Sequence, residues 1–215
     1  SKFTVREKSK SNLVTEADFA AQQAIHDFLR GRYPHHGFHG EEGLNEIRPD
    51  SPYRWIIDPL DGTTNFAHGL PCYAVSIGLE HKGEVIAGVI YDPTRDELFA
   101  AERGAGATLN GQKIAVSEIT DLEKALLVTG FPYDVREHPE RHLPLFQTFL
   151  LRAQGIRRDG SAALNMCYLA MGRFDGFWEG SLSPWDVAAG SLIIREAGGV
   201  ITDYAGGAFR IDARQ

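Results

Sequence analysis

Residues 55–66 have the sequence Trp-Ile-Ile-Asp-Pro-Leu-Asp-Gly-Thr-Thr-Asn-Phe, an apolar run that ends in two carboxylates. The run at 55–57 is short and rich in β-favouring side chains, which predicts the end of a buried strand. Pro59 has no N–H to donate, so we expect strand pairing to stop there. Asp58 and Asp61 are then expected together at the carboxyl end of the strand, where α/β sheets commonly bind ligands.

Two carboxylates this close repel each other unless a proton or a cation lies between them. Carboxylate oxygens suit Mg²⁺, which keeps several waters and takes further ligands from substrate phosphate. Gly62, Thr63 and Thr64 follow at once, and their backbone N–H groups are suited to binding a phosphate. The alternative is an acidic surface turn, since Asp, Pro and Gly are ordinary turn residues. The apolar strand, the threonines and distant partners favour a metal site beside a phosphate site.

The composition is that of a globular protein, with 215 residues, of which 43% are hydrophobic and 24% charged. This length suits one compact unit or two closely packed subdomains. The net charge is -7 and no strong basic run appears, so nucleic acid is not an obvious partner. Cys72 and Cys167 have apolar neighbours and suit a reducing compartment. With no signal peptide or membrane-length apolar run, we predict a cytoplasmic protein without a membrane partner.

The first part of the chain favours a mainly antiparallel sheet with a helix packed on it. The helix is predicted over 15–30, and a capping box formed by Thr15 with Asp18 explains Asp18 without any function. The histidines of 35–43 suit a solvated loop, and only one of Glu41 and Glu42 can join a site if the segment is extended. Alternating apolar residues predict strands over 73–80, 85–91, 97–101 and 108–109.

From about residue 125 the pattern changes to alternating strand and helix signals. Strands are predicted at 125–129, 174–179 and 200–204, and helices at 138–152, 161–171 and 184–197, with residues 155–158 leading into the second of these helices. The helix that begins at Ser161 presents backbone N–H groups to a substrate, although capping alone also explains its start. Asp186 likewise completes a capping box with Ser183. We therefore predict two subdomains, 1–124 with the metal motif and 125–215, in one compact unit.

Taken together, the motifs closely resemble the inositol monophosphatase family of Mg²⁺-dependent, lithium-sensitive phosphatases. They are Lys8 with residues 14–18, Gly40-Glu41-Glu42, residues 55–66, Gly160-Ser161-Ala162-Ala163 and Trp185-Asp-Val-Ala-Ala-Gly190. The resemblance implies an α/β (α+β) fold, layered as an α/β/α/β/α sandwich, and a homodimer. The chain departs from the family at both ends, where we expect an N-terminal helix and a segment after the last strand to be missing.

The resemblance also implies roles for individual residues. The metal ligands for two to three Mg²⁺ ions would be Glu41, Asp58, Asp61, Asp186 and the carbonyl of Leu60. The catalytic set that orients the attacking water would be Thr63, Glu41 and Asp18. The substrate-binding set would be Leu60, Asp61, Gly62, Thr63, Arg157, Gly160, Ser161, Ala162, Glu179 and Asp186, with Arg158 as an alternative to Arg157.

The activity implied is hydrolysis of inositol 1-phosphate, or a related polyol or sugar phosphate, by metal-activated water. Alternatives within the superfamily are phosphatases of fructose 1,6-bisphosphate, 3′-phosphorylated nucleotides or histidinol phosphate. An aspartyl-phosphate phosphatase of the haloacid dehalogenase type would need a nucleophilic Asp where this chain has Pro59. A regulatory binding protein that keeps the fold is the alternative from another class. Glu179 suits hydrogen bonds to ring hydroxyls and favours a polyol.

Overall fold

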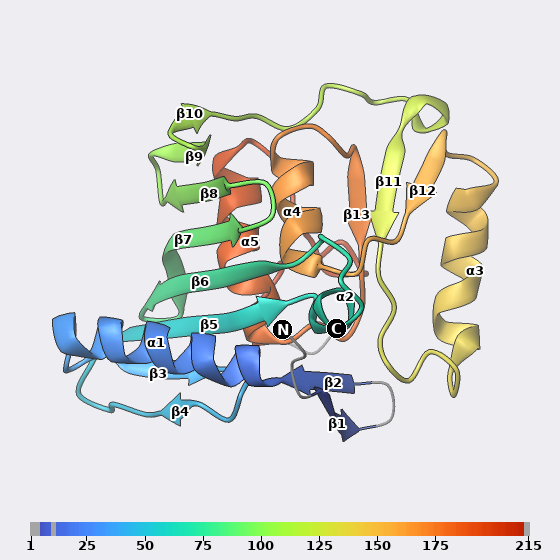
Figure 1. Ribbon diagram of the computed structural model, residues 1–215. Coiled ribbons are helices and arrows are strands. Elements are labelled where there is room, and N and C mark those ends of the chain that lie inside the picture. Colours follow the sequence, from blue (N-terminus) through green and yellow to red (C-terminus); the bar gives the residue numbers. More distant parts are fainter. Residues whose placement is uncertain (1–4, 10–11, 213–215) are drawn as a thin grey trace.

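The computed structural model describes the backbone of residues 5–9 and 12–212, with side chains from Thr15 onward. Its elements form five layers, α/β/α/β/α, as predicted (Figure 1). Helix α1 (Glu16–Arg32) packs on one face of a large sheet, and α5 (Pro184–Glu196) with α4 (Ala162–Ala170) covers the other. A small sheet and α3 (Pro139–Leu150) complete the sandwich. Within the described part of the chain, no helix is both long and apolar enough to traverse a bilayer.

The large sheet has eight strands in the order β10-β9-β8-β7-β6-β5-β3-β4. Every neighbouring pair is antiparallel except β3 with β5, which is parallel, so the expectation of a mainly antiparallel sheet is confirmed. The strands are β3 (Gly37–Gly40), β4 (Asn45–Glu46), β5 (Tyr53–Asp61), β6 (Ala74–His81), β7 (Glu84–Asp92), β8 (Glu97–Glu102), β9 (Gly106–Leu109) and β10 (Gln112–Lys113).

Strand β5 does not end at Pro59, as the sequence suggested, but continues to Asp61. Its register with β6 shifts between Asp58, which pairs with Ser76, and Asp61, which pairs with Ala74. The extra residue in β5 is a bulge, a position where a proline is tolerated in a sheet. Residues three apart on a regular strand face opposite sides, so the bulge is what turns both carboxylates to one side.

The small sheet is parallel, with the strand order β12-β11-β13. Its strands are β11 (Leu126–Thr129), β12 (Gly155–Arg157) and β13 (Gly176–Trp178), and a short 3₁₀ turn, η1 (Leu122–Lys124), precedes it. Helix α3 packs on β12 and α4 packs on β13, each on its own side of the sheet. The division of the chain at residue 124 remains a prediction.

Helix α5 lies close to the large sheet because small residues face each other across the contact. A Cβ on Gly88 would lie 2.9 Å from the Cα of Ala189, and one on Gly78 would lie 3.0 Å from the Cβ of Ala188. Neither position therefore accepts a larger side chain without moving the helix. This close approach brings the first turn of α5, with Asp186, to the end of β5.

Two local predictions were wrong. Residues 37–40 form a strand rather than a solvated loop, and Phe38 within it is fully buried. Residues 200–204 form no strand beyond a single bridge between Thr202 and Ala208, because Asp203 accepts the N–H groups of Ala205 and Gly207 and turns the chain. The hairpin of β1 (Val5–Ser9) and β2 (Asn12–Thr15) was not predicted from the sequence. The side chain of Lys8 is outside the described residues.

Candidate active site

A cluster of three aspartates forms where β5 meets α5. Oxygens of Asp58, Asp61 and Asp186 all lie within 4.8 Å of one another. Two of them come from the bulged end of β5 and the third from the first turn of α5. Asp186 Oδ2 also accepts the N–H of Ser183 at 2.6 Å, so its capping interaction and its place in the cluster coexist.

The cluster places three like-charged groups together, with Asp58 buried and Asp61 and Asp186 half-buried. Burial raises the pKa of Asp58 well above its usual value, and the charges of Asp61, Glu41 and Asp186 raise it further. Burial and Asp61 raise the pKa of Asp186 to about 8. Burial also raises the pKa of Asp61 to about 6, although hydrogen bonds from Ser161 and Ala163 oppose the shift. Carboxylates gathered in this way are stabilised by a cation, and an all-oxygen donor set fits Mg²⁺.

Glu41 lies beside this cluster, directly after β3. Its backbone N–H donates to the carbonyl of Ile57 at 3.2 Å, which fixes it next to β5. Its charge contributes to the raised pKa values of Asp58, Asp61 and Asp186. The turn that follows is held from α1, because the side-chain amide of Gln22 bonds both the N–H and the carbonyl of Glu42. Sequence reasoning gave Gln22 no role, because only the long-range pairing shows it.

Thr63 and Asp18 meet at the same end of the sheet. The Thr63 hydroxyl lies 3.1 Å from Asp18 Oδ1 and 3.0 Å from the carbonyl of Leu60. Because the hydroxyl has one proton, it donates to one of these two acceptors at a time. Asp18 is fully buried, and its Oδ2 accepts both the N–H and the hydroxyl of Thr15. The capping box predicted for α1 is therefore present, and the same carboxylate also contacts Thr63.

The N-terminus of α4 contacts the cluster from the second half of the chain. Asp61 Oδ2 accepts the hydroxyl of Ser161 at 2.5 Å and the N–H of Ala163 at 2.8 Å. Gly160 precedes them with a φ of +82°, a left-handed conformation that suits glycine. The structure thus brings the motif at 160–163 to the motif at 55–66, as the family resemblance implied.

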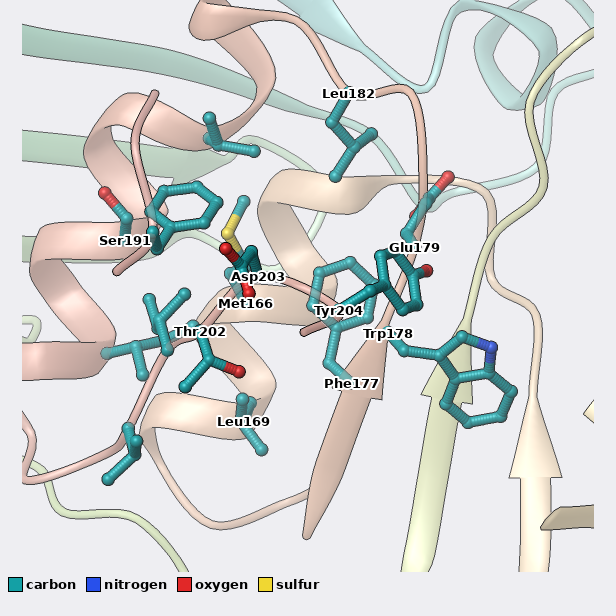
Figure 2. Close-up of a pocket in the computed structure, with 15 residues that line it drawn as sticks. Met166, Leu169, Phe177, Trp178, Glu179, Leu182, Ser191, Thr202, Asp203 and Tyr204 are labelled. Carbon is teal, nitrogen blue, oxygen red and sulfur yellow. The ribbon is translucent and has the colours of Figure 1, made fainter. Parts of the chain in front are cut away.

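Glu179 lies between the acid cluster and a separate cavity. Burial, Asp61 and Asp186 raise its pKa to about 8, and the positive charge of Arg158 opposes the shift. The cavity has a volume of about 230 Å³ and lies among α4, α5, β13 and residues 200–209. Figure 2 shows Glu179 and Tyr204 on one side of a mainly apolar lining. None of the three clustered aspartates lines the cavity, so the cluster and the cavity are distinct sites.

The two arginines before α4 are exposed. Arg157 donates to the carbonyl of Ile156, its own neighbour. Burial raises the pKa of Asp159, and the charge of Arg157 opposes this shift. Arg158 is the one whose charge acts on Glu179.

A layered α/β/α/β/α fold with an oxygen-donor cluster at the end of its central strand defines a candidate site for a hard divalent cation. The model of the inositol monophosphatase family matches residues 1–215, and the chain belongs to that family.

Two curated relatives carry different names. The chain is 47% identical over 208 residues to Nus factor SuhB of Pseudomonas aeruginosa, covering 95% of this chain and 77% of that protein. It is 45% identical over 206 residues to inositol-1-monophosphatase of Rhizobium meliloti, covering 96% and 77%. A solved structure of an IMPase/NADP phosphatase complexed with Mg²⁺ and phosphate matches with a TM-score of 0.86 at 26% identity, covering 98% of this chain and 78% of that one.

Proposed function

We propose that this protein is a Mg²⁺-dependent phosphomonoesterase that hydrolyses inositol 1-phosphate or a related polyol or sugar phosphate. The observation that carries the proposal is the cluster of Asp58, Asp61 and Asp186, whose oxygens lie within 4.8 Å of one another. The family membership supports a phosphatase. The Mg²⁺ and phosphate of the IMPase/NADP phosphatase structure support the same pairing of cation and anion here.

The residues that would hold two to three Mg²⁺ ions are Asp58, Asp61, Asp186, Glu41 and the carbonyl of Leu60. Bound ions supply an activated water and neutralise charge on the phosphoryl oxygens. The remaining work falls to the protein. Backbone N–H groups of Gly62 and Thr63 hold the phosphate, and the Thr63 hydroxyl, donating to Asp18, accepts a hydrogen bond from the attacking water. Asp18 then accepts the hydrogen bond of the Thr63 hydroxyl and increases its ability to accept a proton from the water.

The alcohol part of the substrate would contact the side of the site built by the second half of the chain. Glu179, the turn at 160–162 and one of the two arginines present hydrogen-bonding groups there, together with Asp61. A polyol offers several hydroxyls to such groups, which is why we favour it. Lithium inhibition and a homodimer are further expectations of this proposal.

A second candidate function is a binding role in transcription complexes. The observation that favours it is the name of the Pseudomonas aeruginosa relative, Nus factor SuhB. The two functions are compatible, because the candidate catalytic residues occupy one end of the large sheet. Capture of RNA-polymerase-associated proteins by the purified chain tests this role, and it fails if capture is no greater than by an unrelated acidic protein.

A substrate panel tests the primary proposal. Phosphate release is measured from myo-inositol 1-phosphate, fructose 1,6-bisphosphate, a 3′-nucleotide and histidinol phosphate, each with Mg²⁺ and with a chelator. We expect the highest kcat/KM for inositol 1-phosphate and loss of turnover with the chelator. Hydrolysis that persists in chelator, or no hydrolysis of any of these esters, contradicts the proposal. A trapped aspartyl phosphate would favour the haloacid dehalogenase mechanism instead.

A further inference from the structure

Asn65, two residues beyond Thr63 in α2 (Thr63–Ala67), joins three separate segments of the chain. Its amide nitrogen lies 2.7 Å from the carbonyl of Cys72 and 2.7 Å from the carbonyl of Asp159. A side-chain amide has two N–H donors, and both of them are used here. One partner is seven residues away along the chain and the other ninety-four. Asn65 therefore ties the motif at 55–66 to the entry of α4.

The turn at the start of α4 is pressed against this amide. A Cβ on Gly160 would lie 3.1 Å from the Asn65 nitrogen and 3.3 Å from its oxygen, closer than an ordinary contact. Ser161 and Ala163, which follow directly, donate to Asp61 Oδ2. The position of these two donors thus depends on the turn at Asp159 and Gly160, which Asn65 contacts.

We propose that Asn65 is a positioning residue that sets the orientation of Asp61 through the turn Asp159–Gly160–Ser161. Asp61 has two carboxylate oxygens, and the contacts from α4 occupy Oδ2. These two donors therefore hold the Asp61 carboxylate in one orientation beside Asp58 and Asp186. The activity arm of the test rests on the proposed phosphatase function, whereas the structural claim does not.

A double-mutant cycle tests this coupling. Asn65→Leu keeps the branching at Cγ and removes both donors, and Ser161→Ala removes the hydroxyl that contacts Asp61. We expect Asn65→Leu to lower kcat/KM for inositol 1-phosphate by about 10- to 100-fold, the usual effect of losing a contact that orients a metal ligand. In the Ser161→Ala background we expect the same change to cost only about threefold, because contacting residues in one network are not additive. Equal losses in both backgrounds overturn the proposal.

A second measurement does not depend on activity. Amide hydrogen exchange of Ala163 should become faster in Asn65→Leu, while exchange in the later turns of α4 stays unchanged. If the wild type hydrolyses no phosphate ester but this protection is lost, the proposed function fails and the positioning role stands. If the wild type is active and Ala163 stays protected in the variant, the positioning role is wrong.

The chain supplies a matched control in Asn110. Its side chain also makes two hydrogen bonds to backbone, accepting from Leu98 and donating to Asp96, but in the distant β8–β9 hairpin. Asn110 has a φ of +48°, so Asn110→Gly removes both bonds without backbone strain. We expect this variant to keep wild-type kcat/KM. If Asn65→Leu does not fold, the smaller Asn65→Ala also removes both donors, and a wild-type kcat/KM in that variant overturns the proposal.

Discussion

Two Asp-Pro pairs lie at strands of the same sheet, Asp58-Pro59 at the bulge of β5 and Asp92-Pro93 at the end of β7. Both aspartates are buried, with 1% and 0% of their surface exposed. Asp92 is surrounded by donors from its own turn. It accepts the N–H and hydroxyl of Thr94, at 2.8 and 2.7 Å, and the N–H and guanidinium of Arg95, at 3.2 and 2.8 Å. Asp58 accepts the N–H of Leu60, and carboxylates surround it.

The two environments move the pKa in opposite directions. Burial alone would raise the pKa of Asp92, but the hydrogen bonds from Thr94 and Arg95 outweigh it and lower the pKa. Burial raises the pKa of Asp58, and the neighbouring acids add to the shift. A buried charge that its own turn satisfies is a structural feature. A buried charge among like charges has to be satisfied from outside the protein, which marks a functional site.

The largest expected effect comes from neutralising one member of the cluster. Asp61→Asn keeps the shape of the side chain but removes a charge that holds the cation and an oxygen that accepts from Ser161 and Ala163. We expect kcat to fall about 1,000-fold, which corresponds to about 4 kcal/mol of transition-state stabilisation. Steady-state kinetics over a Mg²⁺ titration measures this. Retention of most of the kcat at saturating Mg²⁺ would refute the assignment of Asp61.

An Asp-to-Asn change at Asp92-Pro93, the Asp-Pro pair outside the cluster, should affect stability instead of turnover. Asp92→Asn removes the ion pair with Arg95, whose guanidinium lies 2.8 Å from the carboxylate. We expect the free energy of unfolding to fall by about 2 kcal/mol, less than for a fully buried pair because Arg95 is partly solvated. Urea unfolding measures this loss, and kcat per folded molecule should change less than about twofold. A large loss of kcat at unchanged stability would remove the contrast between the two sites.

In the sequence, the two Asp-Pro pairs are similar turns after apolar runs. Only the distant motifs that accompany residues 55–66 distinguish Asp58-Pro59 from Asp92-Pro93. Local signals were sufficient for α1, α4 and α5, for the hairpin of β6 with β7 and for the caps at Thr15 and Ser183, because capping and periodicity act within a few residues. The five-layer fold came from the family resemblance.

What the sequence could not show depends on pairing between distant segments. The bulge at Pro59 and the strand at 37–40 are set by register with neighbouring strands, which local composition does not encode. The hydrogen bonds from the side-chain amides of Gln22 and Asn65 to backbone carbonyls likewise join residues twenty and ninety-four positions apart. The sequence therefore predicted acids that the structure brings together, and the structure adds how they are held.

The smallest expected effect is a change in Tm on adding Mg²⁺. It tests the contrast between the raised pKa values of the cluster and the lowered pKa of Asp92. Asp61 and Asp186 have pKa values of about 6 and about 8 in the fold, against about 4 in an unfolded chain. The fold therefore binds more protons than the unfolded chain between about pH 4 and pH 8, and the metal-free protein should lose stability as pH rises through that interval. Asp92, with its lowered pKa, has the opposite sign, since its contribution is present above about pH 4 and is lost in more acidic solution.

Mg²⁺ at ten times its Kd should stabilise the fold by about 1.4 kcal/mol, raising Tm by about 3–6 °C. The rise should be larger at pH 8 than at pH 5, because protons compete with the cation for the same oxygens. Differential scanning fluorimetry at both pH values measures it, with Ca²⁺-free buffer and NaCl of equal ionic strength as the control. Asp92→Asn should keep the full shift and Asp61→Asn should lose most of it. An equal shift in both variants would mean that Mg²⁺ binds elsewhere, and the two Asp-Pro sites would then differ only in their hydrogen bonds.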